Sequence, residues 1–86
     1  MFLHLGNDYL VSTSDIVAII NLDIDHPLDR VTKDIIELGI AERKLQRIGG
    51  IGKEKSLIIT NDKIYLSPIS STTLQKRGQE PFKEGY

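Results

Sequence analysis

The chain has 86 residues, of which 40% are hydrophobic and 27% charged, enough for one small domain with a modest core. It contains no cysteine, so disulfides, Cys-ligated zinc and thiol nucleophiles are excluded. No apolar run approaches the roughly 18 residues of a membrane span, and the N-terminus does not resemble a signal peptide, which predicts a cytoplasmic protein without a membrane partner. A short chain without cross-links often gains stability by self-association, so we expect a homo-oligomer.

The net charge of −1 conceals an uneven distribution of charged residues. Residues 1–29 hold five acids and no Lys or Arg, whereas residues 30–86 hold all eleven Lys and Arg against seven acids. The densest basic stretch runs from Arg43 to Lys55. Such a stretch is either an ordinary solvated surface or an anion-facing patch, for which nucleic acid is the commonest ligand. The isoelectric point of about 6.1 counts against strong nucleic-acid binding by a monomer.

Two short strands are predicted at residues 2–5 and 9–12, joined as a hairpin by the turn cluster Gly6-Asn7-Asp8. A polar corner follows at residues 13–15. Residues 16–20 are nearly all apolar, which predicts a strand that lies mid-sheet or in an interface. Residues 23–27 are expected to form a loop.

A helix is predicted to begin after Asp29, a plausible N-cap, because Val31, Ile35 and Leu38 share one helical face. Gly39 could end this helix, or lie inside it at a cost of about 1 kcal/mol. We favour a helix to about Glu42. A strand over residues 44–48 should follow, because apolar and polar side chains alternate there.

The last part of the chain carries the clearest local signals. Residues 57–59 and 64–66 are β-branched-rich runs, and Asn61-Asp62 between them tolerate the positive φ angles of a hairpin turn. Pro68 should end the second strand near Ser67, since proline cannot donate to a ladder. Ser70 or Ser71 can then cap a helix to Arg77, with Gly78 beyond.

Together these elements predict an α+β fold, a small mixed sheet in the order β-β-β-α-β-β-β-α. We expect a single oligomerising domain over residues 1–78 and a flexible C-terminal tail over residues 79–86.

No pattern of reactive residues indicates catalysis. His4 and His26 lie far apart and make a weak metal site, and the acids show no paired spacing for general acid–base work. No serine lies in a nucleophile elbow. Residues 49–53 lack the spacing of a phosphate loop and precede a strand, so a hairpin loop is the better interpretation. We therefore expect a protein that is not an enzyme and has no metal, cofactor or small-molecule substrate.

The glycine-rich segment also suggests a DNA contact. Glycines let a basic loop adapt to a phosphate backbone, and Lys53 and Lys55 supply charge without reading base edges. Arg47 and Arg43 could extend the same basic edge. No aromatic residue is interleaved, which argues against stacking on single strands and leaves double-stranded DNA as the candidate partner.

Three stretches resemble the bacterial RemA/RemB family of extracellular matrix regulatory proteins: FLHLGNDYLVS, TKDIIE and TNDKIYLSPISSTTLQKR. They cover most of residues 1–77, and the last one is more similar to the RemB branch. The resemblance implies a domain of the LytTR type that assembles into closed rings and regulates transcription, such as that of biofilm matrix genes, through DNA contacts around the ring.

The resemblance also implies where those contacts lie. In RemA-type members an Arg-rich loop and an Arg at the second turn contact DNA. The loop corresponds to residues 52–55, so Lys53 and Lys55 are the nearest matches, whereas the turn position falls at Asp15 and reverses the charge. Two hypotheses follow: a homo-oligomeric DNA-binding transcriptional regulator, or an oligomeric protein-interaction scaffold that has lost DNA binding.

Overall fold

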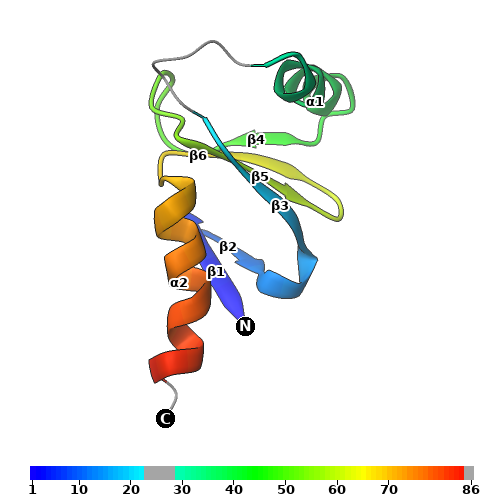
Figure 1. Ribbon diagram of the computed structural model, residues 1–86. Helices are drawn as coiled ribbons and strands as arrows, with labels where there is room; N and C mark the ends of the chain where they lie inside the picture. The colour runs from blue at the N-terminus through cyan, green and yellow to red at the C-terminus, as the bar shows by residue number, and fades with distance from the viewer. Residues whose placement is uncertain (23–28, 85–86) are drawn as a thin grey trace.

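A four-stranded sheet forms the centre of the molecule (Figure 1). The computed structural model describes residues 1–22 and 29–84, so the predicted loop at 23–27 and His26 lie outside the described residues. The strands of this sheet lie in the order β3 (Ile16–Asn21), β5 (Ser56–Thr60), β6 (Ile64–Ser67) and β4 (Leu45–Arg47). β5 is antiparallel to both of its neighbours, and β4 is parallel to β6.

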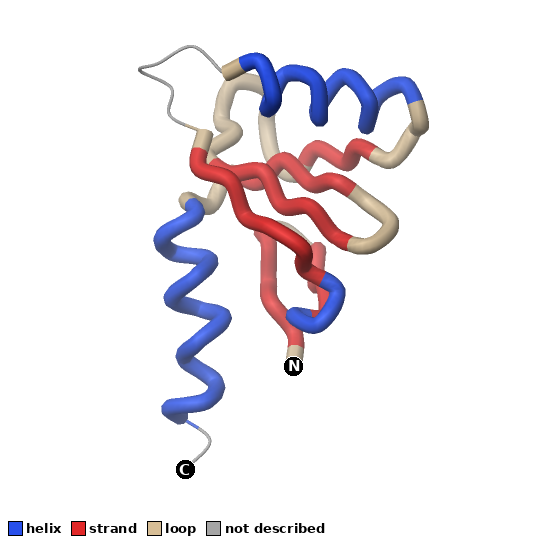
Figure 2. Tube along the Cα trace, turned by 45° about the vertical axis from the view of Figure 1, so that its right-hand side comes forward, coloured by secondary structure: helices blue, strands red, loops and turns tan. Residues whose placement is uncertain are grey.

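The two faces of the sheet are covered by different elements. One face packs against helix α1 (Arg30–Ala41), and the other against helix α2 (Ser71–Glu84) and the antiparallel hairpin of β1 (Phe2–Gly6) and β2 (Tyr9–Ser12) (Figures 1 and 2). Successive side chains of a strand point to opposite faces, so Leu57 enters the α1 core and Ile58 the α2 core. This arrangement explains why β5 is apolar at every central position.

Two buried serines join the sheet to the hairpin and to α2. The Ser67 hydroxyl donates to the Leu5 carbonyl at 2.6 Å and accepts from the Ile69 amide at 3.0 Å. The Ser56 hydroxyl donates to the Ile69 carbonyl at 2.6 Å. Both serines are fully buried, so their hydroxyls take their hydrogen-bond partners from the protein.

Several local predictions are confirmed. The element order matches, both hairpins are present, and β6 ends at Ser67 before Pro68. Asp29 caps α1 by accepting from the Thr32 amide at 2.7 Å, and this bond lowers the pKa of the Asp29 carboxyl. The helix continues through Gly39, where a Cβ atom would lie 3.0 Å from the Ile64 Cδ1 atom. The glycine therefore allows α1 to approach the sheet closely.

The sheet differs from the prediction in two places. Residues 16–20 form an edge strand, because β5 is the only strand that β3 pairs with in the described residues. Of the two places predicted for this strand, the middle of the sheet is therefore wrong, and an interface stays a prediction. The loop at 49–52 is not a hairpin loop, because β6 lies between β4 and β5 in the sheet. The loop instead crosses the end of β6.

Three further predictions were wrong in detail. The buried face of α1 is centred on Thr32 and Gly39, which leaves Val31 and Leu38 exposed by 68% and 58%. Asn61 and Asp62 do not adopt positive φ angles. The second helix does not end at Arg77 but passes Gly78 and reaches Glu84. The flexible tail at residues 79–86 stays a prediction, and neither helix in the described residues is long and apolar enough to span a membrane.

We predict that Ser67→Ala destabilises the fold by about 1–3 kcal/mol, because it leaves the Leu5 carbonyl and the Ile69 amide without their buried partner. Urea unfolding at one fixed protein concentration measures the change. Ser14→Ala is the matched control, since Ser14 is exposed and should change stability by less than about 0.5 kcal/mol. Equal stability of the two variants would contradict the role given to Ser67.

Candidate nucleic-acid interface

The segment of residues 48–55, called the basic loop below, is fixed at both ends to the main sheet. The Ile48 amide donates to the Leu66 carbonyl at 2.8 Å, and the Lys55 amide donates to the Ser67 carbonyl at 2.8 Å. The Lys55 carbonyl accepts from the Leu22 amide at 3.0 Å. The loop therefore has firm ends, and only its centre is free of the sheet.

Glycine permits the course of the loop between these ends. Gly49 and Gly52 have φ angles of +83° and +84°, which L side chains rarely adopt. Gly49 also lies against Pro68, where a Cβ atom would meet the proline Cγ at 3.2 Å. Its conformation and its neighbour both explain the glycine at this position.

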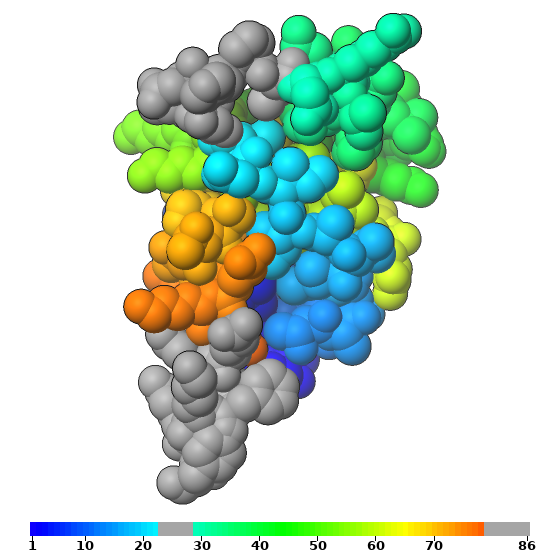
Figure 3. All heavy atoms as spheres, viewed as in Figure 1, coloured from blue at the N-terminus to red at the C-terminus, as the bar shows by residue number. Residues whose placement is uncertain are grey.

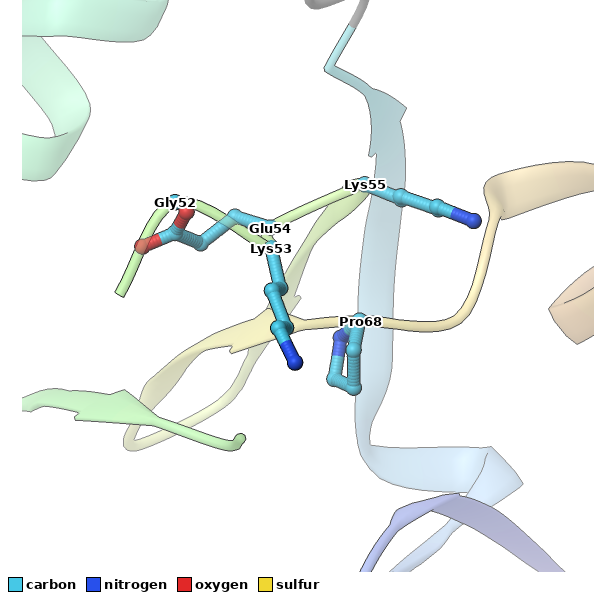
Figure 4. A pocket seen from close by; sticks show the side chains of 5 residues that line it. All are labelled: Gly52, Lys53, Glu54, Lys55 and Pro68. Atoms are coloured by element: carbon cyan, nitrogen blue, oxygen red, sulfur yellow. The ribbon is translucent and has the colours of Figure 1, made fainter. Parts of the chain in front are cut away.

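The two predicted lysines are exposed on this loop and border a shallow hollow of about 360 Å³. Figure 4 shows Lys53 extending beside Pro68 and Lys55 extending in another direction, while Glu54 points away from both. The Glu54 carboxylate instead forms an ion pair with Arg47 at the end of β4. Arg47 neutralises Glu54, and the described residues show no ion pair for either lysine, so both present their positive charge to solvent.

Arg47 thus pairs with Glu54 of the basic loop and is not a free cation. Its side chain is 39% exposed and that of Glu54 is 17% exposed, so the pair is partly shielded from water. This contact is the feature that sequence reasoning missed. The only signal for it was the position of Glu54 between two lysines, which said nothing of a partner.

Arg43 does not join this group. It follows the end of α1 in a left-handed conformation, with φ of 59°, and precedes β4, whereas the basic loop follows β4. The structure therefore brings together Arg47, Lys53 and Lys55 and places Arg43 at the other end of the sheet.

Asp15 also lies at that other end. Its carbonyl accepts from the Asn61 amide at 3.1 Å, and its carboxylate accepts from the Asn61 side chain at 3.3 Å. β5 separates this contact from Lys55, and the six residue steps from Lys55 to Asn61 span about 20 Å at the usual rise of a strand. Asp15 is consequently remote from the basic loop of its own subunit.

A second hollow, of about 310 Å³, opens beside Asp15 and has no Lys or Arg in its lining. Asp62, Tyr65, Phe2 and Leu10 contribute to its walls. Burial, followed by the nearby charge of Asp62, raises the pKa of the Tyr65 hydroxyl. This acidic hollow suits a cation, in contrast to the basic loop.

The His4 ring nitrogen Nε2 donates to the Asn7 carbonyl within the first hairpin turn. The described part of the chain contains no cluster of three or more His, Asp or Glu residues that could hold a metal ion.

The chain is a small α+β domain with an exposed cationic loop. Its sequence matches the RemA-like family, described as extracellular matrix regulatory protein A-like, over residues 2–77. It is 37% identical over 84 residues to the extracellular matrix regulatory protein B of Bacillus subtilis (strain 168), an alignment that covers 96% of each chain. The chain therefore belongs to the RemA-like family, which confirms the resemblance drawn from its sequence.

We predict that Gly49→Ala and Gly52→Ala both destabilise the protein, by about 1–2 kcal/mol for the left-handed conformation alone. Gly49→Ala should lower the free energy of unfolding more than Gly52→Ala. The methyl group at position 49 also meets Pro68, whereas a Cβ atom at position 52 would have nothing within 4 Å. Thermal unfolding of both variants measures the difference. A larger loss in Gly52→Ala would contradict the packing of the loop on Pro68.

Proposed function

We propose that this protein is a homo-oligomeric transcriptional regulator that binds double-stranded DNA through its basic loop. Membership of a family of extracellular matrix regulatory proteins supports a regulatory role. The observation that carries the DNA contact is the ion pair of Arg47 with Glu54, which leaves Lys53 and Lys55 without an ion-pair partner among the described residues at one end of the sheet.

The mechanism we propose is mainly electrostatic. Lysine is a compact charge on a flexible stem, which suits phosphate oxygens and lacks the fork with which arginine reads guanine. Two such contacts bind weakly at physiological salt because they release few counterions. Repetition of the loop in an oligomer raises the effective concentration of the remaining contacts once the first has formed. Closed rings and a LytTR-like arrangement belong to the same proposal.

Arg47 has an indirect role in this mechanism. Without the Arg47 guanidinium, the Glu54 carboxylate would lack its ion-pair partner on the same loop as the two lysines and would oppose the approach of phosphate. A direct contact of Arg47 or Arg43 with DNA stays a prediction.

The alternative function, a scaffold for protein partners, is favoured by one observation. The acidic hollow beside Asp15 is bordered by exposed Phe2 and Leu10, a combination of charge and apolar surface that suits a protein better than DNA. The two functions differ in whether the intact oligomer binds duplex at low salt.

We predict that replacing Lys53 and Lys55 together with Ala weakens duplex binding at least about tenfold, since each subunit loses both phosphate contacts. Fluorescence anisotropy with a labelled duplex measures affinity, and light scattering checks that the oligomer mass is unchanged. The matched control replaces Lys33 and Lys63, two exposed lysines outside the loop, and should bind nearly as the parent does.

Equal losses in the two double variants would show that overall charge, and not the basic loop, governs binding. If the parent protein forms an oligomer but does not bind duplex even at low salt, the scaffold hypothesis would replace the regulator hypothesis.

A further inference from the structure

The outer face of the first hairpin carries exposed apolar side chains. In β1 and β2 the side chains of Leu3, Leu5 and Val11 are buried on the inner face, so Phe2 and Leu10 lie on the outer one. Their exposed fractions are 67% and 62%. An exposed apolar patch with a polar border is typical of a surface that contacts a partner.

The acidic hollow adjoins this outer face, because Phe2 and Leu10 also line the hollow. Other parts of its lining come from the corner before β3, which carries Asp15, and from the turn between β5 and β6, which carries Asp62. Figure 3 shows these two segments, in blue and yellow-green, side by side at the surface, where the Asn61 amide donates to the Asp15 carbonyl. Apolar side chains and two carboxylates therefore border one hollow.

Hydrogen bonds orient both carboxylates. The Asp15 Oδ1 atom accepts from the Asn61 side chain, and the Asp62 Oδ1 atom accepts from the Thr60 hydroxyl, each at 3.3 Å. In the described part of the chain, the other oxygen of each carboxylate has no hydrogen-bond partner, and neither residue forms an ion pair. Lys63 follows Asp62 in the sequence but does not line the hollow. Both carboxylates are thus held in place and free to accept from a cation.

An arginine side chain fits this lining better than other cations do. Its guanidinium has five N–H donors in one plane, which is enough to serve two separate carboxylates. It is also weakly hydrated and stacks on aromatic rings, which Phe2 and Tyr65 supply in the lining. A lysine ammonium is more strongly hydrated and gains less from an aromatic wall.

We propose that the acidic hollow and the outer face of the hairpin bind a segment of a partner protein that presents an arginine between apolar side chains. The arginine contacts the carboxylates of Asp15 and Asp62, and its apolar neighbours cover Phe2 and Leu10. Charge complementarity selects this occupant, because two carboxylates repel the phosphates of DNA. A small cation would leave the apolar side chains exposed, whereas a protein segment buries them.

The proposed docking site is separate from the basic loop. About 20 Å of extended chain separates Lys55 from Asn61, which contacts Asp15. One subunit could therefore hold DNA at the loop and a protein at the hollow at the same time. The inference names the partner chemistry for the protein contact described above as the alternative function, and it does not depend on DNA binding. It also gives the acid at position 15 a role of its own.

Fluorescence polarisation with the full-length chain tests the proposal. The probe is the peptide amide Gly-Leu-Arg-Leu-Gly with a neutral fluorophore, and matched probes carry citrulline or lysine at the central position. The arginine peptide should bind saturably. The citrulline peptide has nearly the same shape without the charge and should bind at least about tenfold more weakly, and the lysine peptide should fall between them.

Charge-neutral variants test the two carboxylates. Asp15→Asn combined with Asp62→Asn removes both charges, and each amide oxygen still accepts from Asn61 or Thr60, so the fold should be kept. This variant should bind the arginine peptide at least about tenfold more weakly and the citrulline peptide as the parent does. Asp8→Asn is the matched control, since Asp8 is exposed and does not line the hollow.

A further pair of variants tests the apolar contact. Leu10→Ser should weaken binding of the arginine and citrulline peptides by a similar few-fold factor, because both peptides have leucines beside the central residue. Val31→Ser is its control, since Val31 is equally exposed but lies on α1, away from the hollow. It should bind both peptides as the parent does.

The outcomes decide the inference independently of the proposed function. Saturable binding that requires the central arginine, both carboxylates and Leu10 supports it. Absence of binding at millimolar peptide, or equal binding of the citrulline or lysine peptide, overturns it. A change of oligomer mass in the carboxylate variant would show that a second copy fills the hollow, and displacement of the peptide by saturating duplex would place DNA there; either result overturns the inference. The duplex affinity of the Lys53 and Lys55 variant is a separate measurement, so either proposal can fail alone.

Discussion

The buried hydrogen bonds of Ser67 hold the parts of this small domain together. Its hydroxyl links the Leu5 carbonyl in the first hairpin to the Ile69 amide, where the chain leaves the sheet for α2. Its carbonyl accepts from the Lys55 amide and so fixes one end of the basic loop. Hairpin, helix and loop therefore depend on one residue at the end of β6. A chain of this size without disulfides has few other interactions that could join these parts.

This constraint has a consequence for function. Since the loop is attached to β6 at both ends, Lys53 and Lys55 are presented at a defined place on the molecule. The pairing of Arg47 with Glu54 neutralises the acid that lies between the two lysines in the sequence. A single subunit offers only two phosphate contacts of this kind, which is too few for tight binding. The proposed activity consequently depends on the proposed assembly.

Signals between neighbouring residues made much of the fold predictable from sequence. Pro68 marks the end of β6, and Asp29 caps α1, because proline geometry and capping act over a few residues. The place of β4 beside β6 was not predictable, since a strand of three residues carries little pattern and its partner is distant in sequence. Strands that follow one another usually pair, and this tendency made the basic loop resemble a hairpin loop.

The candidate site, like the fold, was predictable only where the signal lay between neighbouring residues. Lys53 and Lys55 could be proposed from composition and glycine content, because a basic glycine-rich segment indicates an exposed loop. The partner of Glu54 and the separation of Arg43 from the loop depend on how β4 lies in the sheet. The face of α1 was misplaced because Val31 and Leu38 fit the helical period but lie at the margin of the contact, beside Thr32 and Gly39. The period indicates which residues share a face and not how far the sheet extends beneath it.

The central claim is that weak phosphate contacts at one rim act together in an oligomer. The salt dependence of duplex affinity measures this directly, because the slope of log K against log salt is about −0.9 for each phosphate contacted. Two lysines of one isolated subunit would give a slope near −2. The account predicts a clearly steeper slope for the intact oligomer, in proportion to the subunits that touch the duplex. A slope of about −2 or shallower in an intact oligomer would contradict it.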